Sequence, residues 1–298
     1  MKFGAVVPSF LPYATKQFMV KAVQRIEALG YDSIWFADHL VIPRQDSSHF
    51  RSDVWPEPVT LAAYLAAHTE RVRIGWDVLV TTYRSPFFLA KSLATLDVLT
   101  EGRVIAGLAA GYLEREFAAL GVPFKERGAM TDEHIRVMKA LWTEDPVSFS
   151  GRYYAFSDVH ALPKPVQQPH PPIWIGGNSR PAMRRAVKLG QGWHSLHPKP
   201  EELKSCVAYL RQVERTEGRK QTVVSYSCPW MRITDKPLGQ DRPSLSGSAA
   251  QVTEDFRALE RLGVSYAAVR FGLASKDGAE TLHDLEAFAT QVMPKFKA

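Results

Sequence analysis

An acid and a histidine stand side by side where a buried strand is expected to end. Residues 31–39 read YDSIWFADH, so an apolar run stops at Asp38 and His39. A strand that is apolar on both faces is typical of a sheet covered on both sides. Such α/β sheets place their chemistry at the carboxyl ends of the strands. We predict that both residues are catalytic, with His39 at the reacting centre. Alternatively, Asp38 caps the next turn and His39 is an ordinary loop histidine.

A second segment could hold an anion. Residues 176–181 read GGNSRP, which is two glycines followed by a helix cap and a helix start. Glycines let the backbone approach a ligand closely, and the free N–H groups of a helix start attract negative charge. We expect this segment, with Gly176, Gly177, Asn178 and Ser179, to hold a phosphate group. A tight turn followed by an ordinary helix cap is the alternative.

A third segment ends in small residues. Residues 107–112 read GLAAGY, and a strand that ends in such residues leaves room for something flat or bulky. Because strand carboxyl ends line the site of a barrel, Ala109, Ala110 and Gly111 are candidates to line it. Close packing of the strand against a helix would explain the same residues without a ligand.

Asp77 interrupts the apolar run 72–80, VRIGWDVLV. A buried carboxylate is costly unless it is paired or hydrogen-bonded. We therefore expect a bulge or a strained peptide at this point, or a shorter strand that turns Asp77 toward solvent.

Seven tryptophans are present, and most are expected in the core. Trp55, Trp193 and Trp230 lie at expected loop ends, so we predict that they bind the substrate.

Several other chemistries have no support. His194 and His197 have H-x-x-H spacing in a loop without a carboxylate, so no metal site is predicted. His134 follows an acid on an expected helix, and we expect it at the surface. The chain has no G-x-S-x-G elbow and no Cys–His pair, which argues against a hydrolase.

Composition narrows the partners and the compartment. The net charge is +6 with pI about 9.2, but the basic residues are dispersed and no RNA- or DNA-binding motif accompanies them. Nucleic acid is therefore not expected as a partner. No apolar run reaches about 18 residues, so a membrane is not expected as a partner either. Two cysteines fit a reducing compartment, and the expected location is cytoplasmic.

Strands and helices alternate along the chain. The expected strands are 3–7, 31–38, 72–80, 104–109, 172–177, 192–195, 222–231 and 264–271. Eight strand–helix units in 298 residues predict an α/β fold, a closed (β/α)₈ TIM barrel in one domain, 1–298. Residues 145–172 lose the periodicity and read as an insertion after the fourth unit, with a hairpin near Gly151. An open doubly wound sheet is the alternative, but no G-x-G-x-x-G follows the first strand.

Long segments resemble the luciferase-like monooxygenase superfamily, on its coenzyme F420-dependent oxidoreductase branch. They read SIWFADHLVIP, TTYRSPFFLAKSLATLDVLTEGRVIAGLAAGYLEREFAALGVPFKERG, LWTEDPVSFSGRYYAF, LPKPVQQPHPPIWIGGNS and GQGWH. The stretch 84–128 is the most characteristic. The resemblance implies a barrel with an insertion after the fourth unit and a deazaflavin or flavin ring across the strand ends. It also implies a homodimer.

The resemblance assigns roles to individual residues. Asp38 and His39 match a pair near the ring and substrate, and Asp38 is expected to orient the ring or His39. Asp77 and Val78 match a non-proline cis peptide behind the ring. The phosphate and ribityl chain would contact residues 109–112 and 176–179. Tyr112 stands where some sugar-phosphate-oxidising members have a glutamic acid, so their reaction is not carried over.

The expected function is hydride transfer between F420 and an unidentified small organic substrate. One alternative is an FMN-dependent monooxygenase that uses reduced flavin and oxygen. The other is a non-catalytic barrel that binds flavin or deazaflavin. Residues 43–58 and 235–248 are expected to select the substrate.

Overall fold

Parallel strands close into a ring in the computed structural model, which describes residues 1–11, 13–49, 52, 54–219, 221–273, 275 and 277–296. The strand order is β3-β2-β1-β11-β10-β9-β8-β5-β4, and pairing of β3 with β5 closes the ring. The strands are β1 (Lys2–Val6), β2 (Ser33–Phe36), β3 (Arg73–Trp76), β4 (Leu79–Val80), β5 (Val104–Ala109), β8 (Ile173–Gly176), β9 (Gly192–Leu196), β10 (Val223–Trp230) and β11 (Tyr266–Arg270). Because β3 and β4 are two pieces of one barrel strand, the ring has eight positions, and the predicted (β/α)₈ barrel is confirmed.

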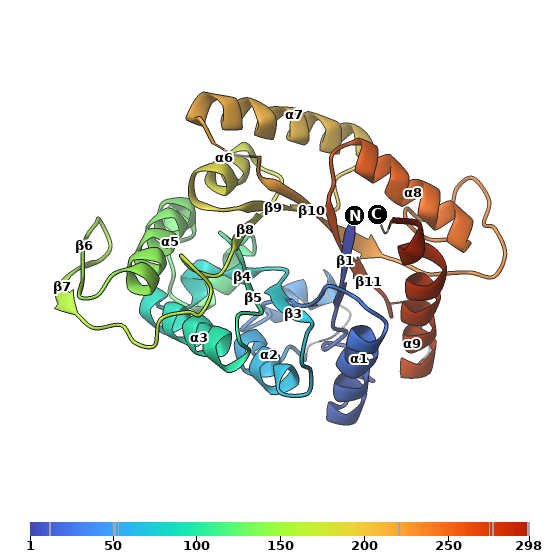
Figure 1. Ribbon diagram of the computed structural model, residues 1–298, viewed down its shortest axis with the longest axis horizontal. Coiled ribbons are helices and arrows are strands. Elements are labelled where there is room, and N and C mark those ends of the chain that lie inside the picture. Colours follow the sequence, from blue (N-terminus) through green and yellow to red (C-terminus); the bar gives the residue numbers. More distant parts are fainter. Residues whose placement is uncertain are drawn as a thin grey trace.

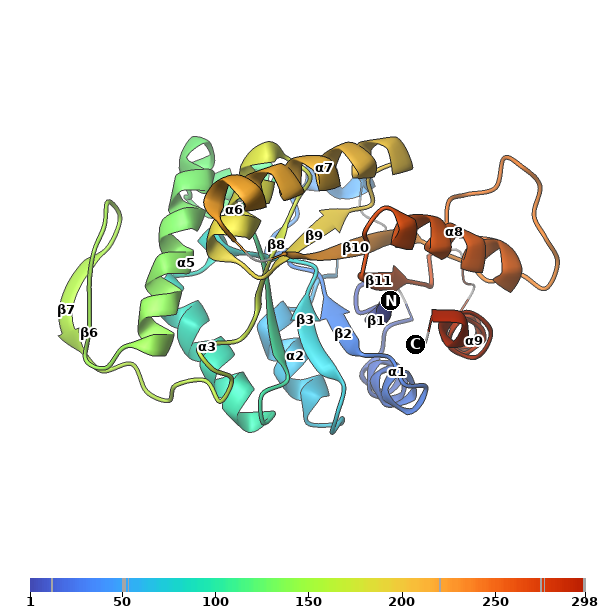
Figure 2. The same cartoon turned by 45° about the horizontal axis from the view of Figure 1, so that its top comes forward.

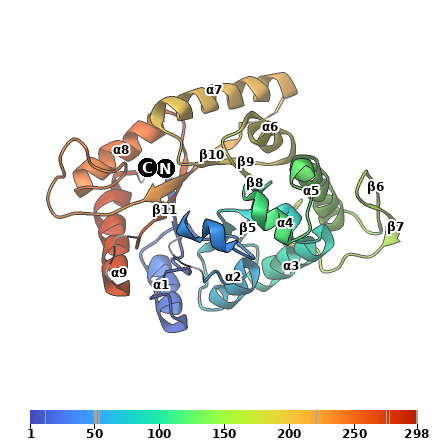
Figure 3. The same ribbon diagram turned by 180° about the vertical axis from the view of Figure 1, so that it is seen from behind.

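Helices surround this ring (Figures 1 and 3). They are α1 (Lys16–Ala28), α2 (Pro58–Ala66), α3 (Pro86–Leu99), α4 (Glu114–Ala119), α5 (Arg127–Thr143), α6 (Arg180–Leu189), α7 (Pro200–Glu217), α8 (Ala249–Arg261) and α9 (Gly278–Ala287). Short 3₁₀ turns cover Arg44–His49, Thr81–Tyr83, Phe124–Glu126 and Met293–Phe296, and Phe288–Val292 is a π-helical turn. None of the helices in the described ranges is both long and apolar enough to span a bilayer.

The barrel interior is aromatic. Trp35 packs against Trp174 with ring centroids 5.4 Å apart, and the His194 ring stacks on Trp35 at 4.9 Å. Gly4 and Gly75 make room for Trp35, because a Cβ on either would lie within 2.7 Å of its side chain. The interior packing therefore supports His194 from below.

A small antiparallel sheet lies outside the barrel, at one edge of the molecule in Figure 2. Its strands are β6 (Val147–Ser150) and β7 (Ala155–Val159), so the hairpin expected near Gly151 is present. The Glu133 carboxylate of α5 accepts the N–H groups of Arg152, Tyr153 and Tyr154, which ties the hairpin turn to the barrel.

Two expectations about local structure are resolved. The third strand is interrupted at Asp77 and Val78, and the peptide bond between them is cis, as the family resemblance implied.

The surface position expected for His134 was wrong. Its side chain is buried, its Nδ1 lies 3.2 Å from the Thr81 carbonyl oxygen, and its ring packs against Tyr154.

Close packing at Gly107 gives a stability prediction. A Cβ on this residue would lie 1.8 Å from the carbonyl oxygen of Trp76, a backbone atom that cannot rotate away. We expect Gly107→Ala to lower the free energy of unfolding in urea by about 1–3 kcal/mol or more. Gly239→Ala is the matched control, since nothing lies within 4 Å of its added Cβ. Equal urea midpoints for the two variants would show that the strands are not packed this closely.

Candidate active site

A cavity of about 1010 Å³ opens at the carboxyl ends of the barrel strands. Small-molecule pockets range from about 300 to 1000 Å³, so this cavity has room for a large cofactor together with a substrate. Most of the residues singled out from the sequence line it. They are Asp38, His39, Trp55, Asp77, Val78, Ala109, Ala110, Gly111, Tyr112, Gly176, Gly177, Ser179 and Trp230.

Two expected site residues do not line the cavity. The Trp193 side chain is fully buried in the outer core, where its indole N–H donates to the Gly177 carbonyl oxygen at 2.8 Å. The prediction that Trp193 binds substrate was therefore wrong. The Asn178 side chain is bonded to the backbone N–H and carbonyl of Leu196, at 2.9 Å each, so it braces two loops instead of facing a ligand.

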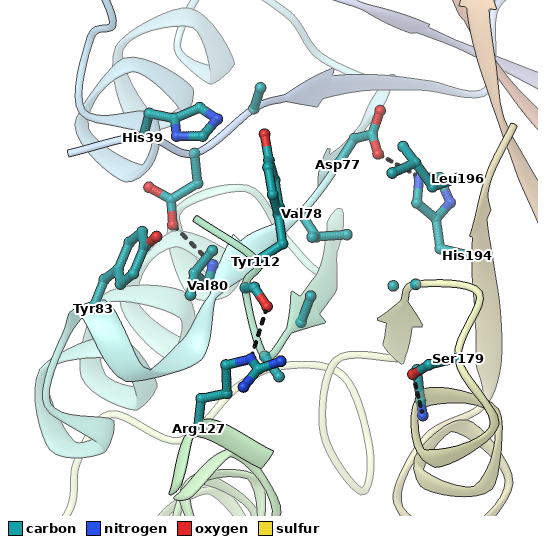
Figure 4. A pocket seen from close by; sticks show the side chains of 18 of the residues that line it. His39, Asp77, Val78, Val80, Tyr83, Tyr112, Arg127, Ser179, His194 and Leu196 are labelled. Atoms are coloured by element: carbon teal, nitrogen blue, oxygen red, sulfur yellow. Dashed lines mark hydrogen bonds and ion pairs between the residues drawn. The ribbon is translucent and has the colours of Figure 1, made fainter. Parts of the chain in front are cut away.

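His39 lies at one end of the cavity, with its ring turned inward (Figure 4). Its Nδ1 is 2.8 Å from Oε2 of Glu116, a residue of α4 whose side chain is fully buried. Although burial opposes its ionisation, hydrogen bonds from His39, Leu40 and Tyr83 hold the pKa of Glu116 below its usual value. Glu116 thus binds Nδ1 of His39, and sequence reasoning missed this residue.

The Asp38 carboxylate is held by an arginine and by a backbone N–H group. Its carboxylate accepts two hydrogen bonds from the Arg84 guanidinium, at 2.8 and 2.9 Å, and one from the Val80 N–H at 2.9 Å. Burial raises the pKa of Asp38, and the hydrogen bonds from Arg84 counteract that rise. Arg84 also binds Glu57 at 2.7 Å. Asp38 therefore links the end of β2 to β4 and to Arg84, while Glu116 is the carboxylate that binds Nδ1 of His39.

Asp77 forms the centre of a charged cluster at the cavity floor. One carboxylate oxygen lies 2.9 Å from Nε2 of His194, and the other accepts hydrogen bonds from Ser227 and Arg270. Burial opposes ionisation, but His194 and Arg270 hold the pKa of Asp77 well below its ordinary value. The shorter-strand alternative, with Asp77 in solvent, is excluded because its side chain is only 3% exposed.

Glycines shape the cavity wall. A Cβ on Gly176 would lie 2.8 Å from Cγ1 of Val78, and Gly177 has φ +109°. Gly111 has φ +79°, and its Cβ would lie 2.7 Å from the ring of Phe117. A side chain at these positions would enter the cavity wall or strain the backbone, so the glycines keep a flat surface open.

Basic side chains also line the cavity, and Arg127 lies on the side away from His39 (Figure 4). Ser179 caps α6, and Lys125, Arg127 and Arg185 line the cavity nearby. Arg185 pairs with Asp132, whereas no acidic partner is found for Lys125 or Arg127 within the described ranges. Sequence reasoning missed all three cations. Arg185 could have been predicted as a lining residue from the sequence. It lies one helical turn after Pro181 and Ala182, and residues four apart share a helix face.

Aromatic side chains surround the His39 end. The Phe10 ring stacks on Trp55 at 4.3 Å and meets Trp230 edge-on at 5.7 Å. Trp55 in turn lies 4.9 Å from the His39 ring, and Tyr112 lies 6.3 Å from it. Sequence reasoning missed Phe10.

Comparison with known families identifies the scaffold. Residues 1–239 match the family model described as luciferase-like monooxygenase. This chain belongs to the luciferase-like monooxygenase family.

Relatives of this luciferase-like protein use two different cofactors. It is 35% identical over 172 residues to an FMNH₂-dependent dimethylsulfone monooxygenase of Pseudomonas putida, a match that covers 57% of this chain but only 47% of the relative. It is 30% identical over 322 residues to an F420-dependent glucose-6-phosphate dehydrogenase of Amycolatopsis mediterranei, covering 94% of each chain.

Solved structures show the same fold. An F420-dependent secondary alcohol dehydrogenase in complex with an F420–acetone adduct superposes with TM-score 0.83 at 17% identity, covering 100% of this chain and 99% of that one. The oxygenating constituent of 3,6-diketocamphane monooxygenase from Pseudomonas putida, in complex with FMN, gives TM-score 0.82 at 19% identity, covering 99% and 98%. The luciferase-like chain is therefore an oxidoreductase-family protein whose relatives divide between F420 and FMN.

The part of the chain that the structure describes contains no candidate metal site. No group of three or more His, Cys, Asp or Glu side chains converges there. Cys206 and Cys228 are buried free thiols.

The Asp77 cluster gives a pH-dependent prediction. A carboxyl whose folded-state pKa is depressed stabilises the fold above its unfolded pKa, and the contribution disappears as pH falls through the folded value. We expect Asp77→Asn to cost about 3 kcal/mol of unfolding free energy at pH 7. The difference from the native protein should persist down to about pH 4 and shrink below it.

Urea titrations at pH 7, 5 and 3 measure this difference. Asp241→Asn is the control, since Asp241 is exposed, and we expect it to change stability by less than about 0.5 kcal/mol. A cost for Asp77→Asn that is absent at pH 7, or that grows as pH falls, would contradict the buried ion-pair cluster.

Proposed function

We propose that this protein is a coenzyme F420-dependent oxidoreductase that transfers a hydride between F420 and a small organic substrate. The supporting observation is the set of cations in the cavity lining: Arg127 lies away from His39 in Figure 4, and Lys125 and Arg185 also line the cavity. F420 has the same division, with a redox ring and a long anionic tail. Lys125 and Arg127 have no acidic partner among the described residues, which leaves their charge available to that tail.

The residues present fit the group. The glycine wall at Gly176 and Gly177 and the small side chain of Ala109 leave a flat surface beside Val78 for a ring. The start of α6, with Ser179, presents backbone N–H groups of the kind that bind phosphate. Bound F420 supplies a ring carbon that accepts or gives a hydride.

Residues of this chain would accept or donate the proton and enclose the substrate. When a substrate hydroxyl is oxidised to a carbonyl, His39 would accept the hydroxyl proton. The reverse direction returns the proton from His39. Phe10, Trp55 and Trp230 enclose the substrate end and exclude water from it.

An FMN-dependent monooxygenase is the second candidate. It is favoured by the identity to the dimethylsulfone monooxygenase and by the FMN-bound structural neighbour. The phosphate site at α6 serves either cofactor, so the extra cations are what favour F420. A non-catalytic barrel is disfavoured because the relatives named above are enzymes.

Homodimer formation, a small-molecule substrate and a cytoplasmic location remain predictions. The exposed Phe88 and Leu99 of α3, 62% and 74% accessible, offer an apolar surface for a second copy.

Cofactor binding tests the proposal. We expect F420 to quench the tryptophan fluorescence of the purified protein at lower concentration than FMN does. Lys125→Gln should weaken F420 binding about two- to fivefold and leave FMN binding within error, because only F420 has an anionic tail beyond the phosphate. Lys21→Gln, at an exposed position on α1, is the matched control. Tight binding of FMN with no effect of F420 would overturn the proposal.

His39 gives the catalytic prediction. We expect His39→Asn to lower kcat by about 100-fold or more while F420 affinity stays within threefold, since general acid–base catalysis contributes about 10²–10⁴-fold. His160→Asn, at an exposed position on the outer hairpin segment, should keep native turnover. Full turnover by the His39 variant in steady-state F420 absorbance assays would remove His39 from the mechanism.

A further inference from the structure

We propose that Glu116 is a positioning residue that fixes the tautomer of His39, so that the proton of the neutral imidazole sits on Nδ1 and Nε2 carries the lone pair. This inference rests on the proposed function for its catalytic meaning, but the tautomer itself is a property of the cofactor-free protein. Neither the family match nor the named relatives assign a role to Glu116.

The Glu116 carboxylate is held by donors on both oxygens. Oε1 accepts the backbone N–H groups of Leu40 and Val41 at 2.8 and 3.2 Å, and Oε2 lies 2.8 Å from Nδ1 of His39. Tyr83 adds a further interaction with the same carboxylate. A fully buried carboxylate with this set of donors is held in one orientation, and it is ionised at neutral pH.

The packing of α4 explains why Glu116 reaches His39. Gly111 takes φ +79° just before the helix, and any Cβ there would collide with Phe117 and Val80. The absence of a side chain at Gly111 lets Phe117 pack against the barrel, which brings its neighbour Glu116 under the loop after β2. Gly111 was expected to contact a cofactor, and the structure gives it this second role.

The hydrogen-bond chemistry decides the tautomer. An ionised carboxylate only accepts hydrogen bonds, so the nitrogen facing it must carry a proton. In neutral His39 that nitrogen is Nδ1, and Nε2 is then the basic nitrogen. The substrate hydroxyl proton would therefore pass to Nε2 as the C–H hydride leaves and the carbonyl forms, while the resulting imidazolium is stabilised by the Glu116 carboxylate.

A glutamine at position 116 should reverse this arrangement. The carbonyl oxygen of Glu116→Gln can still accept from Leu40 and Val41, but its NH₂ group donates to Nδ1 of His39. The imidazole proton would then move to Nε2, and the nitrogen that has to accept a proton would lose its lone pair. Glu114→Gln is the matched control, with the same chemical change in an exposed side chain of the same helix.

Nitrogen-15 NMR of histidine-labelled, cofactor-free protein at pH 8 measures the tautomer directly. The His39 resonances are assigned from their absence in His39→Asn. We expect the Nδ1–H tautomer of His39 in the native protein and in the control variant Glu114→Gln. In Glu116→Gln we expect the Nε2–H tautomer. Native protein with Nε2–H would overturn the proposal, and this result requires no variant at position 116 to fold.

Kinetics then separates the two proposals. With F420 and a turned-over substrate, we expect Glu116→Gln to lower kcat about 10²-fold or more with KM changed less than threefold, because the loss is in proton transfer. A switched tautomer with unchanged kcat would refute the catalytic meaning of Glu116. Absence of F420 binding by native protein with the Nδ1–H tautomer would instead refute the proposed function and leave the tautomer assignment standing.

Discussion

Asp38, Asp77 and Glu116 are carboxylates buried at the carboxyl end of this barrel, and their need for hydrogen-bond and ion-pair partners determines the arrangement of the site. An ionised carboxylate without a partner in the interior would cost several kcal/mol. Asp38 is satisfied by Arg84, Asp77 by Arg270 and His194, and Glu116 by His39 with two backbone N–H groups. Each pair joins a residue after one strand to a residue far along the chain. The pairs therefore fix the cavity rim, the cavity floor and the orientation of the imidazole.

The core beneath the site serves this arrangement. His194 reaches Asp77 because its ring stacks on Trp35, and Trp35 fits because Gly4 and Gly75 lack side chains. The packing of small against large residues inside the barrel thus sets the position of a polar group at its end. The same rule acts on the outside, where Gly111 lets α4 approach and carry Glu116 into place.

Much of this could be predicted from the sequence. Apolar strands and helix starts are local patterns, so the eight-unit barrel and the position of His39 at a strand end followed from them. Side-chain partners were not predictable, because Glu116 lies 77 positions from His39 and they meet only after the barrel closes. Glu116 does lie on the apolar face of its helix with Leu113 and Leu120, which was an available signal. The prediction for Trp193 was wrong because neighbouring side chains on a strand point to opposite faces of the sheet. His194 points into the barrel, so Trp193 points toward the helices.

A crystal structure of the protein with F420 bound tests the proposed function most directly. We predict the ring across Val78 and Ala109 with its reactive carbon near His39, the phosphate at Ser179, and the anionic tail beside Lys125 and Arg127. Nε2 of His39 should lie about 3–3.5 Å from the reacting substrate atom when a substrate is added. A ring bound away from His39, or a tail directed toward Trp55 and Trp230, would contradict it.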